Sequence, residues 1–380
     1  MARLASAGIM LGIIAVAVLL DRYDQDFYLF SVQEDEYLEW ATVWAFLFAA
    51  VLFGFASVHR QRNEKRNPWF LICLSAFCFV FAMEEISWGQ RILGFRPPTY
   101  FLDQNFQQEL NYHNIIEKDF RKLLLKMLIL AYGLLLPVLA MEQTTRRLVD
   151  KLSFVAPPTI LIIPFSVTAA FYHIYPLQFT GEITELAFGF GLMFSALIYL
   201  SETNSALWHW WSNKWAMLRH SFITVCLLTF VTLLIGIGNA TVARHSFNAD
   251  PHVLETARVE ALAIANDMAA LYRNNKPGVV TRCKDHRRMN GLAKRLRTDY
   301  LYTSEFASLV EQGMSEERAQ YFIDPWNSPY WMRHDCLSSD GIQQVFIYSF
   351  GPNRKRDSAK GQLSGDDIGV IIRYTPDEFE

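Results

Sequence analysis

Seven stretches of the chain are apolar, and each has about the length of a membrane-crossing helix. They cover residues 4–20, 40–58, 68–86, 122–141, 154–175, 183–200 and 220–239. A helix needs about 20 such residues to cross roughly 30 Å of hydrocarbon. The pattern therefore predicts an α-helical membrane bundle of seven transmembrane helices. The first stretch runs into Asp21, Arg22 and Tyr23 without a small-residue cleavage pattern, so we interpret it as a retained helix and not as a signal peptide.

The pattern changes after the seventh stretch. From about His252, apolar residues recur at steps of three and four positions, which predicts an amphipathic helix that ends before Pro277 and Gly278. Short segments of strand character follow. The predicted domains are a six-helix transmembrane region at 1–218 with an outer loop at 87–121, a seventh membrane helix that continues into the amphipathic helix at 219–275, and a β domain at 276–380.

Composition and charge agree with this division. Hydrophobic residues make up 52% of the chain and charged residues only 19%, whereas soluble domains carry about 25% charged residues. The deficit lies in the first 240 residues, so we expect membrane lipids as partners of that part. The net charge of −3 offers no basic surface for nucleic acid.

The loop charges predict an orientation. Basic residues outnumber acidic ones in the loops after the second, fourth and sixth stretches, and acidic residues predominate in the other loops. Because Lys and Arg favour the cytoplasmic side, the N-terminus is expected inside and the C-terminal domain outside. In a bacterium this means the inner membrane and the periplasm.

The cysteines divide in the same way. Cys73, Cys78 and Cys226 lie in apolar stretches, whereas Cys283 and Cys336 are the two cysteines of the C-terminal region. In an oxidising compartment this pair predicts a disulfide, worth roughly 3–4 kcal/mol for a loop of this length. Two separate buried thiols are the alternative.

Three ordered motifs in the C-terminal region resemble those of a known family. They are Asp324-Pro325-Trp326-Asn327-Ser328-Pro329-Tyr330, then Tyr348-Ser349-Phe350-Gly351-Pro352-Asn353, then Gly365-Asp366-Asp367-Ile368. Together with the preceding helix, they make residues 220–376 resemble the major pseudopilin of type II secretion systems. The resemblance implies an α+β pilin-like domain, in which a long N-terminal helix packs on a small antiparallel sheet.

The resemblance also implies a calcium site and pilin-like or secretion-system subunits as partners. The positions that match the family's calcium loop are Asn353, Asp366 and Asp367, and Asp357 could contribute another ligand. The alternative is a loop that has lost its metal and is held by Asx-turn hydrogen bonds. The family's cleavage glycine and its glutamate at the fifth mature position are missing, because Ser221 and Cys226 stand at those positions. We therefore expect that the filament-subunit role is lost.

The third apolar stretch ends in acidic residues. A helix continued at 100° per residue places Glu84, Ser87 and Arg91 on one face, and Glu85 on another. The sequence Glu-Glu-x-Ser-Trp-Gly-Gln that starts at Glu84, with the amide-rich loop after it, is similar to a stretch of uncharacterised bacterial polytopic membrane proteins. Ionisable residues at membrane depth usually face a cavity or a partner.

The predicted topology gathers further polar residues at this outer boundary. They are Glu84, Glu85, Glu109, His113, His173, Glu182 and Glu185. Such a set could hold Zn²⁺ or provide a general base, and we take Glu84, Glu85, His113 and His173 as candidate catalytic residues. A structural polar network and a transport path are the alternatives, and the sequence has no spacing typical of a metalloprotease.

Two functions remain open. The first is an interaction or accessory protein that displays a pseudopilin-like domain in the periplasm, related to type II secretion or pilus-type systems. The second is a membrane-embedded, metal-dependent hydrolase or transferase that acts on a lipid-linked substrate at the periplasmic side.

Overall fold

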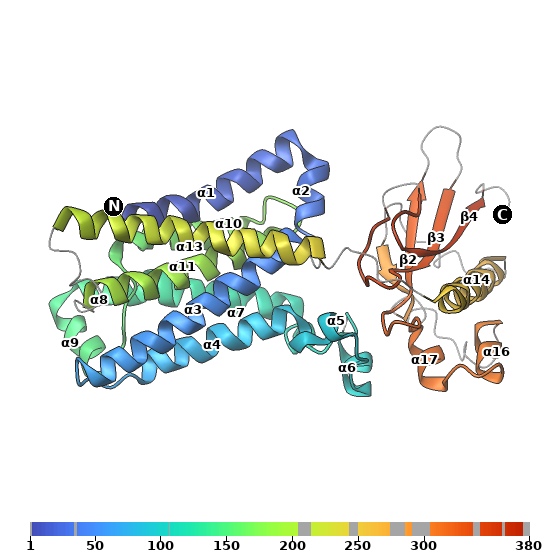
Figure 1. Cartoon of the computed structure of the whole chain (residues 1–380), viewed down its shortest axis with the longest axis horizontal. Helices are drawn as coiled ribbons and strands as arrows, with labels where there is room; N and C mark the ends of the chain where they lie inside the picture. Colours follow the sequence, from blue (N-terminus) through green and yellow to red (C-terminus); the bar gives the residue numbers. More distant parts are fainter. Residues whose placement is uncertain are drawn as a thin grey trace. The chain divides into compact units, whose positions relative to one another are not determined.

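The computed structural model divides the chain into two compact units (Figure 1). The first unit comprises Met1–Trp88 and Ile116–Val242, and the second comprises Gly89–Ile115 and Ala243–Glu380. The structure describes residues 2–33, 36–105, 107–203, 214–242, 250–273, 286–290, 305–336, 343–358 and 362–374.

The described part of the first unit is helical. Its elements are α1 (Ala2–Tyr23), α2 (Gln25–Ser31), α3 (Tyr37–Arg62), α4 (Trp69–Glu85), a short 3₁₀ turn η1 (Ser87–Gly89) at the boundary of the units, α7 (Lys118–Leu130), a π-helical turn η2 (Ala131–Leu135), α8 (Leu136–Met141), α9 (Gln143–Lys151), a 3₁₀ turn η3 (Thr159–Leu161), α10 (Ile162–Ile174), α11 (Thr180–Thr203) and α13 (Lys214–Val242). α3 packs against α4, α11 and α13, and its Phe46 stacks on Phe81 with ring centroids 4.2 Å apart.

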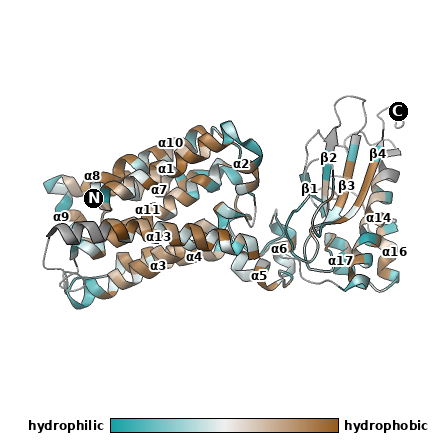
Figure 2. Cartoon of the chain, turned by 45° about the horizontal axis from the view of Figure 1, so that its top comes forward, coloured by the Kyte–Doolittle hydropathy of each residue, from teal (hydrophilic) through white to brown (hydrophobic). Residues whose placement is uncertain are grey.

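Five helical segments among the described residues are long and apolar enough to cross a membrane. They are Ala2–Tyr23, Tyr37–Arg62, Lys118–Met141, Thr180–Thr203 and Phe222–Val242. Apolar residues cover these helices along their length (Figure 2). The stretches predicted at 68–86 and 154–175 also form helices, but α4 has 17 residues and Thr159–Ile174 is a shorter apolar helix. The chain is thus a candidate membrane protein with five such segments, and seven crossings remain a prediction.

The end of α4 differs from the prediction. The helix stops at Glu85, and Ser87, Trp88 and Gly89 all have positive φ values of 48°, 53° and 82°. A left-handed backbone over these residues cannot continue a right-handed helix. The predicted helix face that joins Glu84 to Arg91 is therefore wrong. Instead, the indole Nε1 of Trp88 donates a hydrogen bond of 2.6 Å to Glu84.

The second unit combines helices with a small sheet. Its elements are α5 (Gln90–Leu93), α6 (Thr99–Gln104), α14 (Pro251–Arg273), β1 (His286–Arg288), α16 (Glu305–Glu311), α17 (Glu316–Tyr321), β2 (Trp331–Cys336), β3 (Gln343–Ser349) and β4 (Ile368–Tyr374). The four strands pair in the order β1-β2-β3-β4, each pair antiparallel. We call α14, α16, α17 and the four strands the sheet domain.

The core of the sheet domain follows from strand alternation. Successive side chains of a strand point to opposite faces, so Val345 and Ile347 of β3 share one face and Phe346 and Tyr348 share the other. Val345 and Ile347 belong to the same buried cluster as Ile264 of α14, which packs over β3 and β4. A long amphipathic helix on a small antiparallel sheet agrees with the expectation from the sequence.

The structure groups the loop after α4 differently from the predicted domains. The outer loop 87–121 was expected with the transmembrane region, but Gly89–Ile115 clusters with the sheet domain in the second unit. We call residues 89–115 the excursion, because the chain returns to the first unit after it. The predicted disulfide remains untested, since Cys283 lies outside the described residues. Cys73, Cys78 and Cys226 are free thiols.

Candidate functional site

Three carboxylates converge in the first unit. Glu85 is the last residue of α4, and Glu182 and Glu185 lie one turn apart at the start of α11. One oxygen from each lies within 4.8 Å of the others, and each side chain is half-buried. Among the described residues, these three form the one group of potential metal ligands that meets so closely.

The surroundings of this group are charged and aromatic. Arg121 at the start of α7 and Glu39 in the first turn of α3 both interact electrostatically with Glu85. Tyr175 follows α10, and its ring receives the ammonium of Lys122 at 4.0 Å from the centroid. The guanidinium of Arg121 on α7 thus partly balances the charge of Glu85.

The three side chains would all bind a cation through carboxylate oxygens, and this limits the kind of cation that would fit. Carboxylate oxygens suit hard cations such as Mg²⁺, Ca²⁺ and Mn²⁺, whereas zinc sites usually include His or Cys. No His or Cys belongs to the group of three among the described residues. His173 is exposed on α10, and Glu84 bonds to Trp88. The three carboxylates therefore suit a hard cation better than the expected zinc.

Two residues of the predicted outer set lie in the other unit. Glu109 and His113 belong to the excursion, and Glu109 pairs with Arg288 of β1 at 3.4 Å. The sequence analysis predicted Glu109 and His113 beside the membrane carboxylates because it assigned the whole outer loop to the transmembrane region. The structure brings together Glu85, Glu182 and Glu185 from that set.

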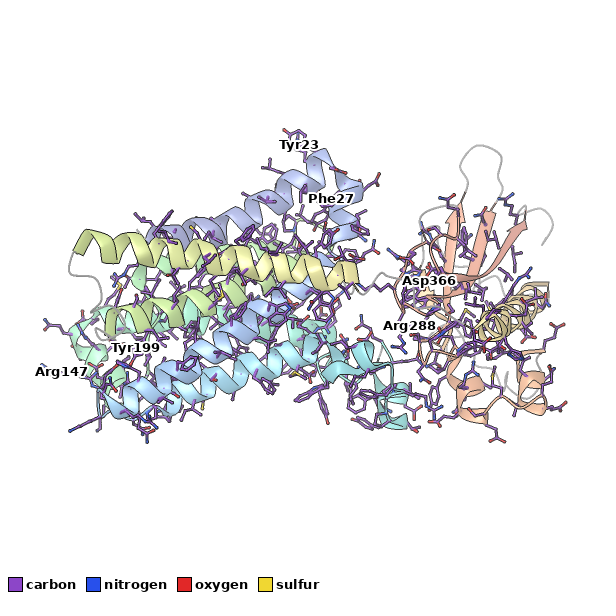
Figure 3. All side chains as sticks on the ribbon, in the orientation of Figure 1. Tyr23, Phe27, Arg147, Tyr199, Arg288 and Asp366 are labelled. Atoms are coloured by element: carbon purple, nitrogen blue, oxygen red, sulfur yellow. The ribbon has the colours of Figure 1, made fainter. Side chains whose placement is uncertain are left out.

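The Asp-rich loop between β3 and β4 forms a second candidate site, and Figure 3 labels its Asp366. Asp366 accepts the backbone N–H of Asn353 at 2.9 Å, and Asp367 accepts that of Ser358 at 2.7 Å. Asn353 donates its side-chain amide to Asp357 at 2.7 Å. The loop residues predicted from the sequence thus lie together, and Asp357 joins them.

The chemistry of this loop fits a cation in part. The Oδ1 atoms of Asp366 and Asp367 are buried and have no hydrogen-bond partner among the described residues. Burial raises the pKa of both carboxyl groups to about 7, and for Asp366 the neighbouring Asp357 adds to the effect. A calcium ion needs six to eight oxygens and would relieve this repulsion. Asn353 instead uses its side chain within the turn, because its Oδ1 accepts the N–H of Lys355.

A buried aspartate organises the turn before β2. Asp324 is 0% exposed and its Oδ1 accepts the N–H groups of Trp326 and Ser328 at 2.9 and 2.8 Å. Ser349 of β3 donates to its other oxygen. Burial raises the pKa of Asp324 to about 7 although these hydrogen bonds act in the opposite direction. Asn327 in this turn has φ of 65°, a left-handed conformation that Gly and Asn tolerate best.

Sequence analysis missed the residues that bind the excursion to the sheet domain. They are Arg288, Glu317, Tyr321 and Asn327, which contact excursion residues more than 170 positions earlier in the chain. No local pattern marks such residues. Covariation between the two segments is the signal that would find them.

Comparison of the chain with protein-family models, curated proteins and solved structures gives no match.

Proposed function

We propose that this chain is a membrane-anchored interaction protein of the bacterial inner membrane, which displays a pseudopilin-like domain in the periplasm. The partners are pilin-like or secretion-system subunits, and recognition uses the outer surface of the sheet domain. The membrane helices hold the domain at the bilayer and prevent its extraction into a filament. The cytoplasmic N-terminus and seven crossings of the sequence analysis belong to this proposal.

The observation that carries the proposal is the order of elements after the last candidate span. α13 is followed by α14, which packs on an antiparallel sheet, and the Asp324 turn leads into β2. The signature of the resembled family is Asp-Pro-Trp-Gly-x-Pro-Tyr, in which glycine stands at the position of Asn327. Asn327 adopts the left-handed conformation that glycine would allow. The backbone at Asn327 thus supports the resemblance to the pseudopilin family, although the residue itself differs from the family's glycine.

A calcium ion would serve the domain through the Asp-rich loop. Asp357, Asp366 and Asp367 are the residues that would hold it, and the bound cation would neutralise their mutual repulsion. The loop joins β3 to β4, so its order affects the edge of the sheet. The ion is expected to stabilise the domain and to take no chemical part in recognition.

The outer side of α14 is a testable recognition surface. Val259 and Leu262 are 44% and 48% exposed and lie one turn apart. The test measures binding between the full-length protein in nanodiscs and the purified soluble domains of the host cell's pilin-type subunits. Binding should weaken about tenfold on Val259→Glu or Leu262→Glu, since each buries a charge in the contact. Glu311→Arg, at an exposed position of α16, is the control.

Two outcomes would count against this proposal. One is the absence of binding to every pilin-type subunit in the presence of calcium. The other is binding that both α14 variants leave unchanged, which would exclude this face.

A second candidate function rests on the convergence of Glu85, Glu182 and Glu185. A membrane-embedded, metal-dependent hydrolase or transferase would use these carboxylates to hold a cation and activate water at the periplasmic side. Metal analysis of the purified full-length protein tests this function. About one divalent metal per chain that Glu185→Gln removes would favour it, and a metal-free protein that gains no stability from Mg²⁺, Mn²⁺ or Zn²⁺ would exclude it.

A further inference from the structure

The excursion contacts parts of the sheet domain that lie far away in sequence. The pairs it forms are separated by 179 to 233 residues. We propose that four residues of the sheet domain form an intramolecular docking surface whose occupant is the excursion: Arg288, Glu317, Tyr321 and Asn327. We call this surface with the excursion bound to it the clasp. The clasp opens separately from the core of the sheet domain.

Charge complementarity supports this occupant. The carboxylate of Glu109 meets the guanidinium of Arg288 at 3.4 Å, with side chains only 11% and 7% exposed. Near α6, Arg96 forms an ion pair with Glu317, whose other oxygen accepts the hydroxyl of Thr99 at 3.0 Å. The two contacts have opposite polarity, because the excursion supplies the acid in one and the base in the other. This reversal fixes the direction in which the segment lies on the surface.

Tyr321 at the end of α17 provides a second type of contact. Its hydroxyl donates to Asp103 of α6, and its backbone carbonyl accepts the amide of Gln108 at 3.4 Å. Leu102, Tyr321 and Ile323 form a small buried cluster of their own. One residue of the sheet domain thus joins the middle of the excursion by polar and apolar contacts.

The Asp324 turn holds the beginning of the excursion. The left-handed Asn327 donates its side-chain amide to the carbonyl of Gly94 at 3.0 Å, a bond that a glycine at this position could not make. Gly94 has φ of 68°, and a Cβ there would overlap the guanidinium of Arg354. Arg354 in turn donates to the carbonyl of Trp326 at 3.0 Å. The beginning of the excursion therefore also approaches Arg354 of the Asp-rich loop.

The excursion is shaped by its own amides. The Nδ2 of Asn105 donates to the carbonyls of Glu109 and Asn111 at 2.7 and 2.9 Å, and the Oε1 of Gln90 accepts the N–H of Leu110 at 2.6 Å. These bonds need no contribution from the sheet domain. A segment that keeps its shape by itself can leave and rejoin the docking surface without refolding.

The apolar contact between the excursion and the sheet domain is small, so we expect the clasp to open before the core of the sheet domain. The cluster shared by the excursion and the sheet domain has three residues, whereas the core between α14 and the sheet includes Ile264, Phe306, Tyr330 and Ile347 among others. Regions with few buried apolar contacts open at lower free energy than the core. Opening would uncover the charged side chains of Arg288 and Glu317.

Hydrogen–deuterium exchange on the full-length protein in nanodiscs tests this inference. In the wild type, amides of residues 99–111 should exchange at least about 100-fold faster than those of β3, which reports the core. Glu109→Arg and Arg288→Glu should each accelerate exchange in residues 99–111 by a further factor of about ten, because each leaves a buried charge unpaired. The double variant restores opposite charges and should return within about threefold of the wild type. Glu311→Arg is the matched control, since that side chain is exposed.

The outcomes separate the inference from its alternatives. Equal exchange of residues 99–111 and β3, changed in parallel by every variant, would show one cooperative unit and overturn separate opening. Single variants that leave residues 99–111 unchanged would overturn the docking contact. If a charge reversal also unfolds β3, Tyr321→Phe decides, because it removes one hydroxyl and should accelerate exchange in the excursion alone by about threefold. A Tyr321→Phe protein with wild-type exchange would then refute the proposal.

Discussion

Replacement of Asp324 by Asn should change how the stability of the sheet domain depends on pH. The wild-type carboxyl group is fully buried, and its pKa is raised from 3.8 to about 7. A group whose pKa is raised by folding stabilises the folded state below its ordinary pKa, and this contribution disappears as pH rises through the folded value. Between pH 5 and pH 8 the wild type should lose about 2.5 kcal/mol from this group alone.

The amide side chain introduced by Asp324→Asn cannot ionise, so this part of the pH dependence should vanish. Its oxygen can still accept the N–H groups of Trp326 and Ser328, and its NH₂ group can meet Ser349, so the turn is expected to persist. Relative to the wild type, the variant should therefore gain about 2.5 kcal/mol of stability between pH 5 and pH 8.

Amide exchange of β3 in the full-length protein, corrected for the intrinsic rate at each pH, gives the free energy of opening. The difference between wild type and variant isolates Asp324, because Asp366 and Asp367 have raised pKa values in both proteins. Glu311→Gln at an exposed position is the control. If wild type and variant show the same loss of stability between pH 5 and pH 8, the argument from burial is refuted.

Three further predictions concern other parts of the chain. Gly94→Ala should accelerate exchange in the excursion about tenfold, because alanine is strained at φ of 68° and the new Cβ displaces the guanidinium of Arg354. Gly313→Ala, with φ of 109° and open space around it, is the control outside the excursion and should leave exchange in the excursion unchanged, and a Gly94→Ala protein with wild-type exchange would contradict the prediction. Glu185→Gln should weaken Mn²⁺ binding to the full-length protein at least about tenfold, with exposed Glu202→Gln as the control, and unchanged titration would count against a cation at the three carboxylates. Asp367→Asn should abolish the rise in thermal stability that Ca²⁺ gives to the wild type, as measured by a thermal shift in nanodiscs. An equal rise in the wild type and the variant would exclude this loop as the calcium site.

The periodicity of the sequence predicts local structure well because helices depend on residues that are close in the chain. The amphipathic pattern from His252 corresponds to α14, and the long apolar stretches correspond to helices of the first unit. The end of α4 was mispredicted for a local reason as well. A helix face drawn through Ser87 assumes ordinary backbone dihedrals, but Trp88 lies in the left-handed region.

The arrangement of the site depended on distant contacts, and these could not be derived from one sequence. The predicted outer set included Glu85, Glu182 and Glu185, but nothing in their spacing separated them from Glu109. That glutamate finds its partner in Arg288, 179 positions later. Arg288 stands beside Arg287 in a three-residue strand, and no pattern distinguishes it from a solvated surface residue.

The sequence separation of the clasp has a consequence for biosynthesis. Residues 89–115 are made well before Tyr321 and Asn327, which follow their partners by 218 and 233 positions. At about 5–20 residues per second, the ribosome needs roughly 10–45 s to supply the missing surface. During that interval the excursion has left the ribosome and cannot dock. Its many amides and charges keep it hydrated, so the composition of this segment suits a chain that must wait for its partner without aggregating.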